Sequence, residues 1–120
     1  MHDYQMGVIE SRFADMIWEN EPISSTELSK RSEAMLGWKK STAYTVLKRL
    51  CDKGIFQNNK GTVTSVISRR DFYSVQSEKF VEETFAGSLS AFLTAFTARK
   101  NLTSEEVDCL RRMVAEYEEG

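Results

Sequence analysis

The chain has 120 residues, a formal net charge of −2 and ordinary apolar content, which fits one domain or a small domain plus an assembly segment. It has no apolar run near the ~20 residues of a membrane span and no signal-peptide pattern at its N-terminus. Cys51 and Cys109 are too few for a disulfide framework, and His2 alone cannot supply a zinc site. We expect a cytoplasmic protein with no membrane insertion, metal or cofactor.

The N-terminal third predicts two helices separated by a short edge strand. Apolar residues at helical spacing predict a first helix over about 10–19, and Pro22 prevents its continuation. Ile23-Ser24 is long enough only for an edge strand. The sequence from Ser24 to Glu27 fits a capping box, which predicts a second helix to about Met35. The apolar set of this second helix is weak and consists of Leu28, Ala34 and Met35.

The segment from Trp38 to Gly54 predicts a third helix with two chemically different faces. Its apolar stripe follows the spacing i, i+3, i+4 and i+7, and comprises Ala43, Val46, Leu47 and Leu50. The opposite face carries short hydroxyls between cations, which suits base edges flanked by two phosphate backbones. We interpret this segment as a recognition helix for the DNA major groove. Ordinary solvated helix faces also carry Lys, Arg and Thr, so the rest of the sequence must distinguish a recognition helix from such a face.

A β-hairpin is predicted after Gly54, because the periodicity changes to short runs of β-branched and aromatic residues. The two strands are expected over 55–57 and 63–67, with turn residues at 58–61 and Lys60 at the tip. Three helices followed by a hairpin is the order of a winged helix-turn-helix. The fold class predicted is therefore mainly α with a small β-hairpin wing, followed by a C-terminal helical segment.

The second half predicts three more helices, over about 70–85, 89–96 and 103–117. Roughly 50 residues can scarcely bury so many bulky side chains, so we expect a homodimer formed through these helices. In the alternative, they fold back on the DNA-binding domain of a monomer. We divide the chain into a DNA-binding domain, 1–69, and a dimerisation domain, 70–120. The expected dimerisation residues are Phe80, Phe85, Leu89, Phe92, Leu93, Phe96, Leu110, Val114 and Tyr117.

The charges are divided unevenly along the chain. From Trp38 to Arg70 there are eight cations against one acid, whereas residues 71–120 have five cations against ten acids. A basic segment joined to an acidic one indicates two different partners, although acidic helices are also simply well solvated. The expected DNA-binding residues are Lys39, Lys40, Ser41, Thr42, Tyr44, Thr45, Lys48, Arg49, Lys53 and Lys60.

The sequence resembles the penicillinase-repressor family of bacterial transcriptional regulators (BlaI/MecI/CopY). The matching pieces are Ile17-Trp18, the run from Ile23 to Leu28, Trp38, the run from Ser41 to Leu50, Lys53-Gly54, the run from Phe85 to Leu89 and the run from Leu102 to Glu106. The resemblance implies a winged-helix repressor that dimerises through its C-terminal helices and binds a palindromic operator.

The same resemblance implies roles for individual residues. It places Thr42 and Thr45 in the groove and Arg49 near phosphate. It also implies relief by proteolysis near Ala95-Phe96, between the fifth and sixth helical segments, in response to a membrane sensor protease.

Four departures from the family pattern affect these expectations. The family usually has Pro then Lys where this chain has Lys40 then Ser41, and its wing is richer in Arg and Tyr than residues 61–65 are here. The cleavage pattern has Asn where Ala95 stands. The copper-responsive branch ends in paired C-x-C motifs, whereas this chain has only Cys109 there.

Other function classes remain open at this point. Winged helices also serve as protein-interaction modules, and a ligand-sensing regulator would need a pocket. The aromatic residues that could line such a pocket are Phe72, Tyr73, Phe80 and Phe85, although their helical spacing favours a plain core. An enzyme is the weakest alternative, because one histidine and no nucleophile motif leave little to carry the chemistry.

Overall fold

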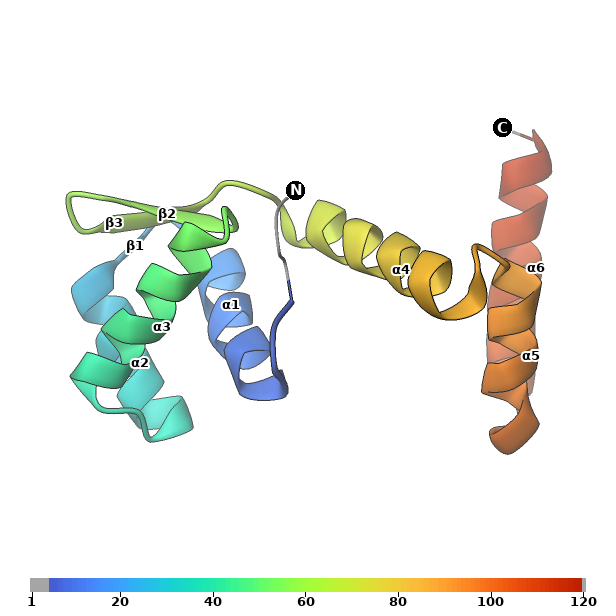
Figure 1. Ribbon diagram of the computed structural model, residues 1–120, viewed down its shortest axis with the longest axis horizontal. Coiled ribbons are helices and arrows are strands. Elements are labelled where there is room, and N and C mark those ends of the chain that lie inside the picture. The colour runs from blue at the N-terminus through green and yellow to red at the C-terminus, as the bar shows by residue number, and fades with distance from the viewer. Residues whose placement is uncertain (1–4, 120) are drawn as a thin grey trace. The chain divides into compact units, whose positions relative to one another are not determined.

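The computed structural model describes residues 5–119, which form two compact units that adjoin at Ser77 and Glu78 in the sequence. The elements are α1 (Val8–Asn20), β1 (Ile23–Ser24), α2 (Ser25–Leu36), α3 (Lys40–Asp52), β2 (Phe56–Asn59), β3 (Thr62–Ser65), α4 (Arg69–Phe85), α5 (Leu89–Arg99) and α6 (Ser104–Glu119) (Figure 1). The predicted mainly α, winged helix-turn-helix fold is confirmed.

The second helix begins and ends at local signals in the sequence, whereas α1 and α3 begin without a side-chain cap. Ser24 caps α2, because its hydroxyl accepts from the Glu27 amide at 3.0 Å. The Glu27 carboxylate accepts from Arg31 at 3.1 Å, one turn further along. Gly37 ends α2 in the left-handed conformation, with φ +68°, and donates its N–H to helix carbonyls. The turn between α2 and α3 therefore follows from local sequence.

One prediction for α2 is wrong, because Ala34 and Met35 are exposed rather than buried. Only Leu28 of the expected apolar set enters the core, and Ser29 and Ser32 lie beside it on the buried side. Ser32 can be buried because its hydroxyl donates to the Leu28 carbonyl at 2.7 Å. The inner face of α2 is therefore built from small polar residues, which let neighbouring helices approach closely.

The sheet has the order β1-β3-β2, so both β1 and β2 are edge strands, as expected for Ile23-Ser24. Ile23 pairs with Val63, and Asn59 pairs with Thr62. The turn is shorter than predicted, because only Lys60 and Gly61 lie between the strands, both with positive φ. Two positive-φ residues match the twist of a tight hairpin, so Asn58 and Asn59 extend β2 instead of forming the turn.

β3 ends at Ser65, before the predicted strand end at residue 67. The amides of both Val66 and Ile67 donate to the Ile55 carbonyl, at 2.8 and 3.4 Å, and this arrangement replaces the regular ladder. Val66 is 59% exposed. The chain therefore leaves the sheet two residues before the predicted strand end and continues into α4.

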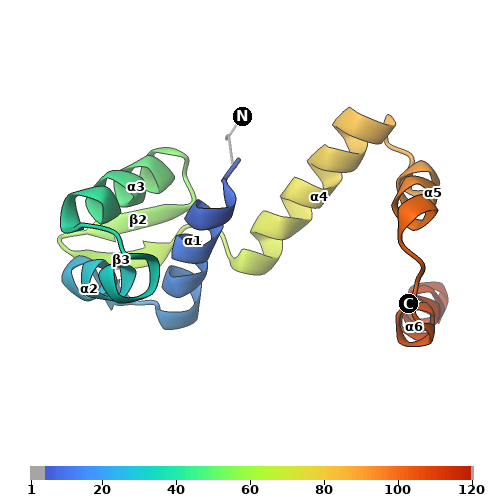
Figure 2. The same ribbon diagram turned by 90° about the horizontal axis from the view of Figure 1, so that it is seen from below.

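The core of the first unit is formed by buried side chains of its helices and its sheet. Figure 2 shows the arrangement of these elements from below the view of Figure 1. Trp38 packs under the helices as expected, with its ring 5.2 Å from the Phe13 ring. Trp18 joins the start of α4 to this core, because its ring lies 5.4 Å from the Phe72 ring and its indole N–H donates to the Ile67 carbonyl at 3.0 Å. The buried apolar side chains are Phe13, Ala14, Met16, Ile17, Ile23, Leu28, Ala43, Val46, Leu47, Leu50, Ile55, Phe56, Val63 and Phe72.

The second unit has well-formed helix ends. Ser88 caps α5, because its hydroxyl accepts from the Ala91 amide at 3.1 Å. Thr103 and Glu106 form a complete reciprocal capping box at the start of α6, with distances of 2.9 and 3.1 Å. Hydrogen bonding from the Thr103 backbone, followed by that from the Thr103 side chain, lowers the pKa of the Glu106 carboxyl. The helices are therefore specified locally.

The described part of the chain has no helix with the length and apolarity that a membrane crossing requires. The same residues hold no cluster of three or more His, Cys, Asp or Glu placed to bind a metal ion.

Candidate nucleic-acid interface

The packing of α3 determines which of its residues face outward. The predicted apolar stripe is buried throughout, with exposed fractions of 3% at Ala43, 6% at Val46, 3% at Leu47 and 0% at Leu50. A helix that buries one stripe must present the opposite face to solvent. The predicted DNA-contact positions in and beside α3 therefore lie on its solvent side, apart from Tyr44 and Lys53, which are half-buried, and Lys60 is exposed on the hairpin.

Short hydroxyl side chains occupy the middle of this outer face. Ser41, Thr42 and Thr45 are all exposed. The Thr45 hydroxyl donates to the Ser41 carbonyl at 2.8 Å, one turn earlier in the helix. The hydroxyl proton is used within the helix, so the exposed side chain has its methyl group and its oxygen lone pairs left for an external contact. Such a surface can contact a thymine methyl group or accept a hydrogen bond from a base amino group.

Tyr44 differs from the other candidates for base contact, because its ring is half-buried and turns toward α2. Its hydroxyl donates to the Ser25 hydroxyl at 3.4 Å. Hydrogen bonding to Ser25 is the main cause that lowers the pKa of the Tyr44 phenol. The side chain therefore links α3 to the first residue of α2.

The cations at the N-terminal end of α3 are open to solvent. Lys39 and Lys40 are both exposed, and the Lys40 ammonium lies 5.9 Å from the centroid of the Tyr44 ring. Lys60 is exposed at the tip of the hairpin, with φ +52°. Lysine side chains at such positions can reach phosphate oxygens without displacing a buried partner.

The cations at the C-terminal end of α3 have partners within the chain. Lys48 forms an i,i+4 ion pair with Asp52 at 3.6 Å. Arg49 pairs with Glu10 of α1 at 3.4 Å, and the Lys53 ammonium donates to the backbone carbonyl of Gln5. Sequence reasoning missed Glu10 and Gln5, since their role arises from the packing of the N-terminal segment beside α3. An acidic residue in the first turn of a helix is ordinarily explained by the helix dipole.

The outer face of α3 supplies hydrogen bonds and positive charge rather than a reactive group. The cysteine of α3 is Cys51, in its last turn. Burial, followed by the negative charge of Asp52, raises the pKa of the Cys51 thiol. A raised pKa disfavours the reactive thiolate, so this cysteine is suited to packing rather than to covalent chemistry.

The second unit presents an extended apolar surface. Neither α5 nor α6 has a buried side chain. On α6, the exposed fraction is 58% at Val114 and 91% at Tyr117, and on α5 it is 63% at Leu89 and 43% at Phe96. Contiguous exposed apolar residues of this kind indicate an interaction surface.

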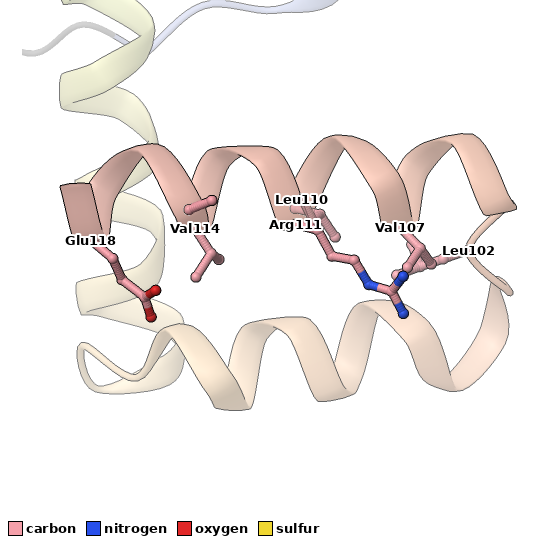
Figure 3. A pocket seen from close by; sticks show the side chains of 7 residues that line it. Leu102, Val107, Leu110, Arg111, Val114 and Glu118 are labelled. Atoms are coloured by element: carbon pink, nitrogen blue, oxygen red, sulfur yellow. The ribbon is translucent and has the colours of Figure 1, made fainter. Parts of the chain in front are cut away.

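The expected dimerisation residues occupy this surface. The rings of Phe80 and Phe85 both contact Phe92, with centroid distances of 6.1 and 5.7 Å, and Phe92 contacts Phe96 at 6.1 Å. Leu110 lines two shallow grooves, of about 370 and 270 Å³. Figure 3 shows the larger groove, in which Val107, Leu110 and Val114 lie along α6. The aromatic residues proposed as a ligand pocket are divided, because Phe72 is buried in the first unit whereas Phe80 and Phe85 pack in the second.

The predicted cleavage bond lies inside a helix. Ala95 and Phe96 are exposed residues of α5, several residues before its end at Arg99. This position differs from the junction between the fifth and sixth helices that the resemblance implied. A protease that requires an extended substrate could reach this bond only after local opening of α5.

Comparisons with known proteins agree on one family. The family model described as Penicillinase repressor matches residues 6–116 of the chain. The penicillinase repressor of Bacillus licheniformis is 27% identical over 117 residues, which cover 94% of this chain and 91% of the relative.

Proposed function

This chain belongs to the penicillinase repressor family, and we propose that it is a transcriptional repressor that acts as a homodimer bound to a palindromic DNA operator. One observation carries the proposal: α3 buries its whole apolar stripe and exposes a face of short hydroxyls with cations at both ends. We assign DNA binding to residues 1–69 and dimerisation to residues 70–120.

The apolar face of the second unit supports the proposed dimer. Helices without a single buried side chain gain little from folding alone, whereas a second copy can cover the same face by two-fold symmetry. Two linked winged domains then meet two half-sites. For helix-turn-helix dimers these are about 34–36 Å apart, or a multiple of one DNA turn.

The same proposal includes relief of repression by an environmental signal that triggers cleavage of the chain. Cleavage at Ala95-Phe96 would separate α6 from the first part of α5, so that the dimer surface would be divided between two fragments. The protein would act in the cytoplasm, without catalytic activity of its own, downstream of a membrane sensor protease.

Selection of bound duplexes from a random pool, followed by a gel shift with competitor DNA, tests the proposal. We expect a palindromic sequence to be enriched and bound by a dimer. A protein-interaction module would enrich no sequence, and a ligand-sensing regulator would release the enriched sequence when its effector is added. Failure of the wild-type protein to bind any duplex would refute DNA binding.

Replacing Arg49 by alanine is expected to lower affinity for all DNA sequences. Loss of one phosphate contact reduces the slope of log affinity against log salt by up to about 0.9 per protomer. Titrations at several salt concentrations measure this slope. An unchanged slope would show that Arg49 does not contact phosphate.

Replacing Thr45 by valine is expected to relax sequence preference rather than reduce affinity uniformly. Valine keeps the methyl group and removes the hydroxyl, so discrimination at one base pair should fall by roughly 3- to 10-fold, less than for a bidentate contact. Affinities for operator variants at each position measure the change. Identical preferences for the wild-type and variant proteins would show that the Thr45 hydroxyl does not contact a base.

A further inference from the structure

We propose that Glu10 of α1 is a specificity-determining residue that restrains Arg49 and limits its attraction to nonspecific DNA. The proposal rests on the DNA-binding function proposed above. It goes beyond that function because it assigns a role to a residue that lies outside the recognition helix.

The Glu10–Arg49 pair joins two helices that are distant in sequence. The Arg49 Nη1 atom lies 3.4 Å from the Glu10 Oε1 atom, across 39 residues of chain. The two side chains differ in environment: that of Arg49 is 50% exposed, whereas that of Glu10 is 23% exposed. The carboxylate is therefore held in the protein, and the guanidinium extends from it toward solvent.

The second oxygen of Glu10 strengthens this assignment. Glu10 Oε2 is buried and has no hydrogen-bond partner among the residues that the structure describes. A partly buried carboxylate depends on its remaining partner, because complete loss of that partner would leave an uncompensated charge. Arg49 is thus expected to keep its contact with Glu10 while its other N–H groups bind phosphate, since a guanidinium has five donors.

This arrangement changes what Arg49 contributes to binding. Its charge is partly offset by Glu10, so its nonspecific attraction to phosphate is reduced. Its direction is fixed in advance, so less side-chain entropy is lost when it meets one defined phosphate. The charge offset weakens binding to every DNA duplex. The fixed direction of Arg49 restores affinity only for a duplex that places a phosphate where Arg49 points. Glu10 therefore increases discrimination between operator and other DNA.

The test replaces Glu10 by glutamine, which preserves shape and removes the charge. At 0.15 M salt we expect affinity for nonoperator DNA to rise by about 5- to 30-fold, with a salt slope steeper by up to about 0.9 per protomer. Affinity for the selected operator should rise less, so the ratio of the two affinities falls. A purely structural role for Glu10 would not steepen the salt slope.

Glu19→Gln is the matched control, because it removes the same charge from the other end of α1. Glu19 pairs with Arg69 at 3.2 Å, and Arg69 keeps a second partner in Asp15. Nine residues of helix separate Glu19 from Glu10, or roughly 13 Å, which exceeds the Debye length at this salt concentration. We expect this variant to match the wild-type protein in both affinity and slope.

A double variant determines whether Glu10 acts through Arg49. In the Arg49→Ala background, the added Glu10→Gln change should have no further effect on affinity or slope. A gain that persists without Arg49 would mean that Glu10 merely repels phosphate, and it would overturn the proposal. Nonoperator DNA that binds wild-type and Glu10→Gln proteins with equal affinity and salt slope would also overturn it, while leaving the repressor function intact. Absence of wild-type binding to any duplex would instead refute the proposed DNA binding itself.

Discussion

Val114→Asp is expected to convert the proposed dimer into a monomer and to weaken operator binding by about 10²-fold or more. The side chain is 58% exposed on α6, so aspartate costs the isolated helix little. In a dimer the same position would bury an unpaired charge against an apolar surface, which costs several kcal/mol. Loss of the link between two winged domains then removes the gain from bivalent binding, typically 10²- to 10⁴-fold.

Val66→Asp provides the control for this experiment. It makes the same substitution at a position that is 59% exposed, outside the helical unit. Sedimentation velocity should show a dimer for the wild-type and Val66→Asp proteins and a monomer for Val114→Asp. If both variants stay dimeric, the face of α6 around Val114 is not the interface. If Val114→Asp is monomeric but binds the operator as tightly as wild type, the bivalent mechanism is wrong.

Local patterns predicted most of the fold, because most of its determinants lie within one turn of the chain. The stripe from Ala43 to Leu50 specified the buried side of α3, and the capping residues Ser24, Ser88 and Thr103 marked where helices begin. These signals act between residues three or four apart, so a single sequence contains them fully.

The features that local patterns missed depend on long-range packing. Arg49 and Lys53 looked like free cations because a helical pattern shows only which face is polar. Their partners, Glu10 and Gln5, precede them by 39 and 48 residues. Tyr44 likewise turns toward Ser25, 19 residues earlier. The candidate interface was thus outlined from sequence as a surface, whereas the partners of its charged residues required the tertiary structure.

The hairpin shows a different limit of sequence reasoning. Residues 58–61 contain two asparagines, a lysine and a glycine, which suit several turn types. Only the positive φ values of Lys60 and Gly61 define the two-residue turn, and Asn58 then accepts from the Gly61 amide at 3.0 Å. Composition indicated a turn, but it did not set the register of the strands.

The second large effect is expected from reversing the charge at the start of α3. In the Lys39→Glu/Lys40→Glu variant, each protomer loses two exposed cations and gains two carboxylates on the face proposed to meet DNA. Four lost phosphate contacts per dimer should lower the salt slope by about 3.6 and the affinity at 0.15 M salt by roughly 10²- to 10³-fold. Both lysines are exposed, so thermal stability should change little.

Lys79→Glu/Lys100→Glu makes the same charge change in the second unit, where both lysines are also exposed. If α3 meets DNA, this control should keep nearly the wild-type salt slope, because it leaves every cation of the first unit in place. If DNA affinity instead depends on net charge alone, the two double variants should lose affinity equally. Equal losses would remove the reason for assigning the DNA contact to α3, whereas a loss confined to Lys39 and Lys40 would locate the phosphate contact at the entrance of that helix.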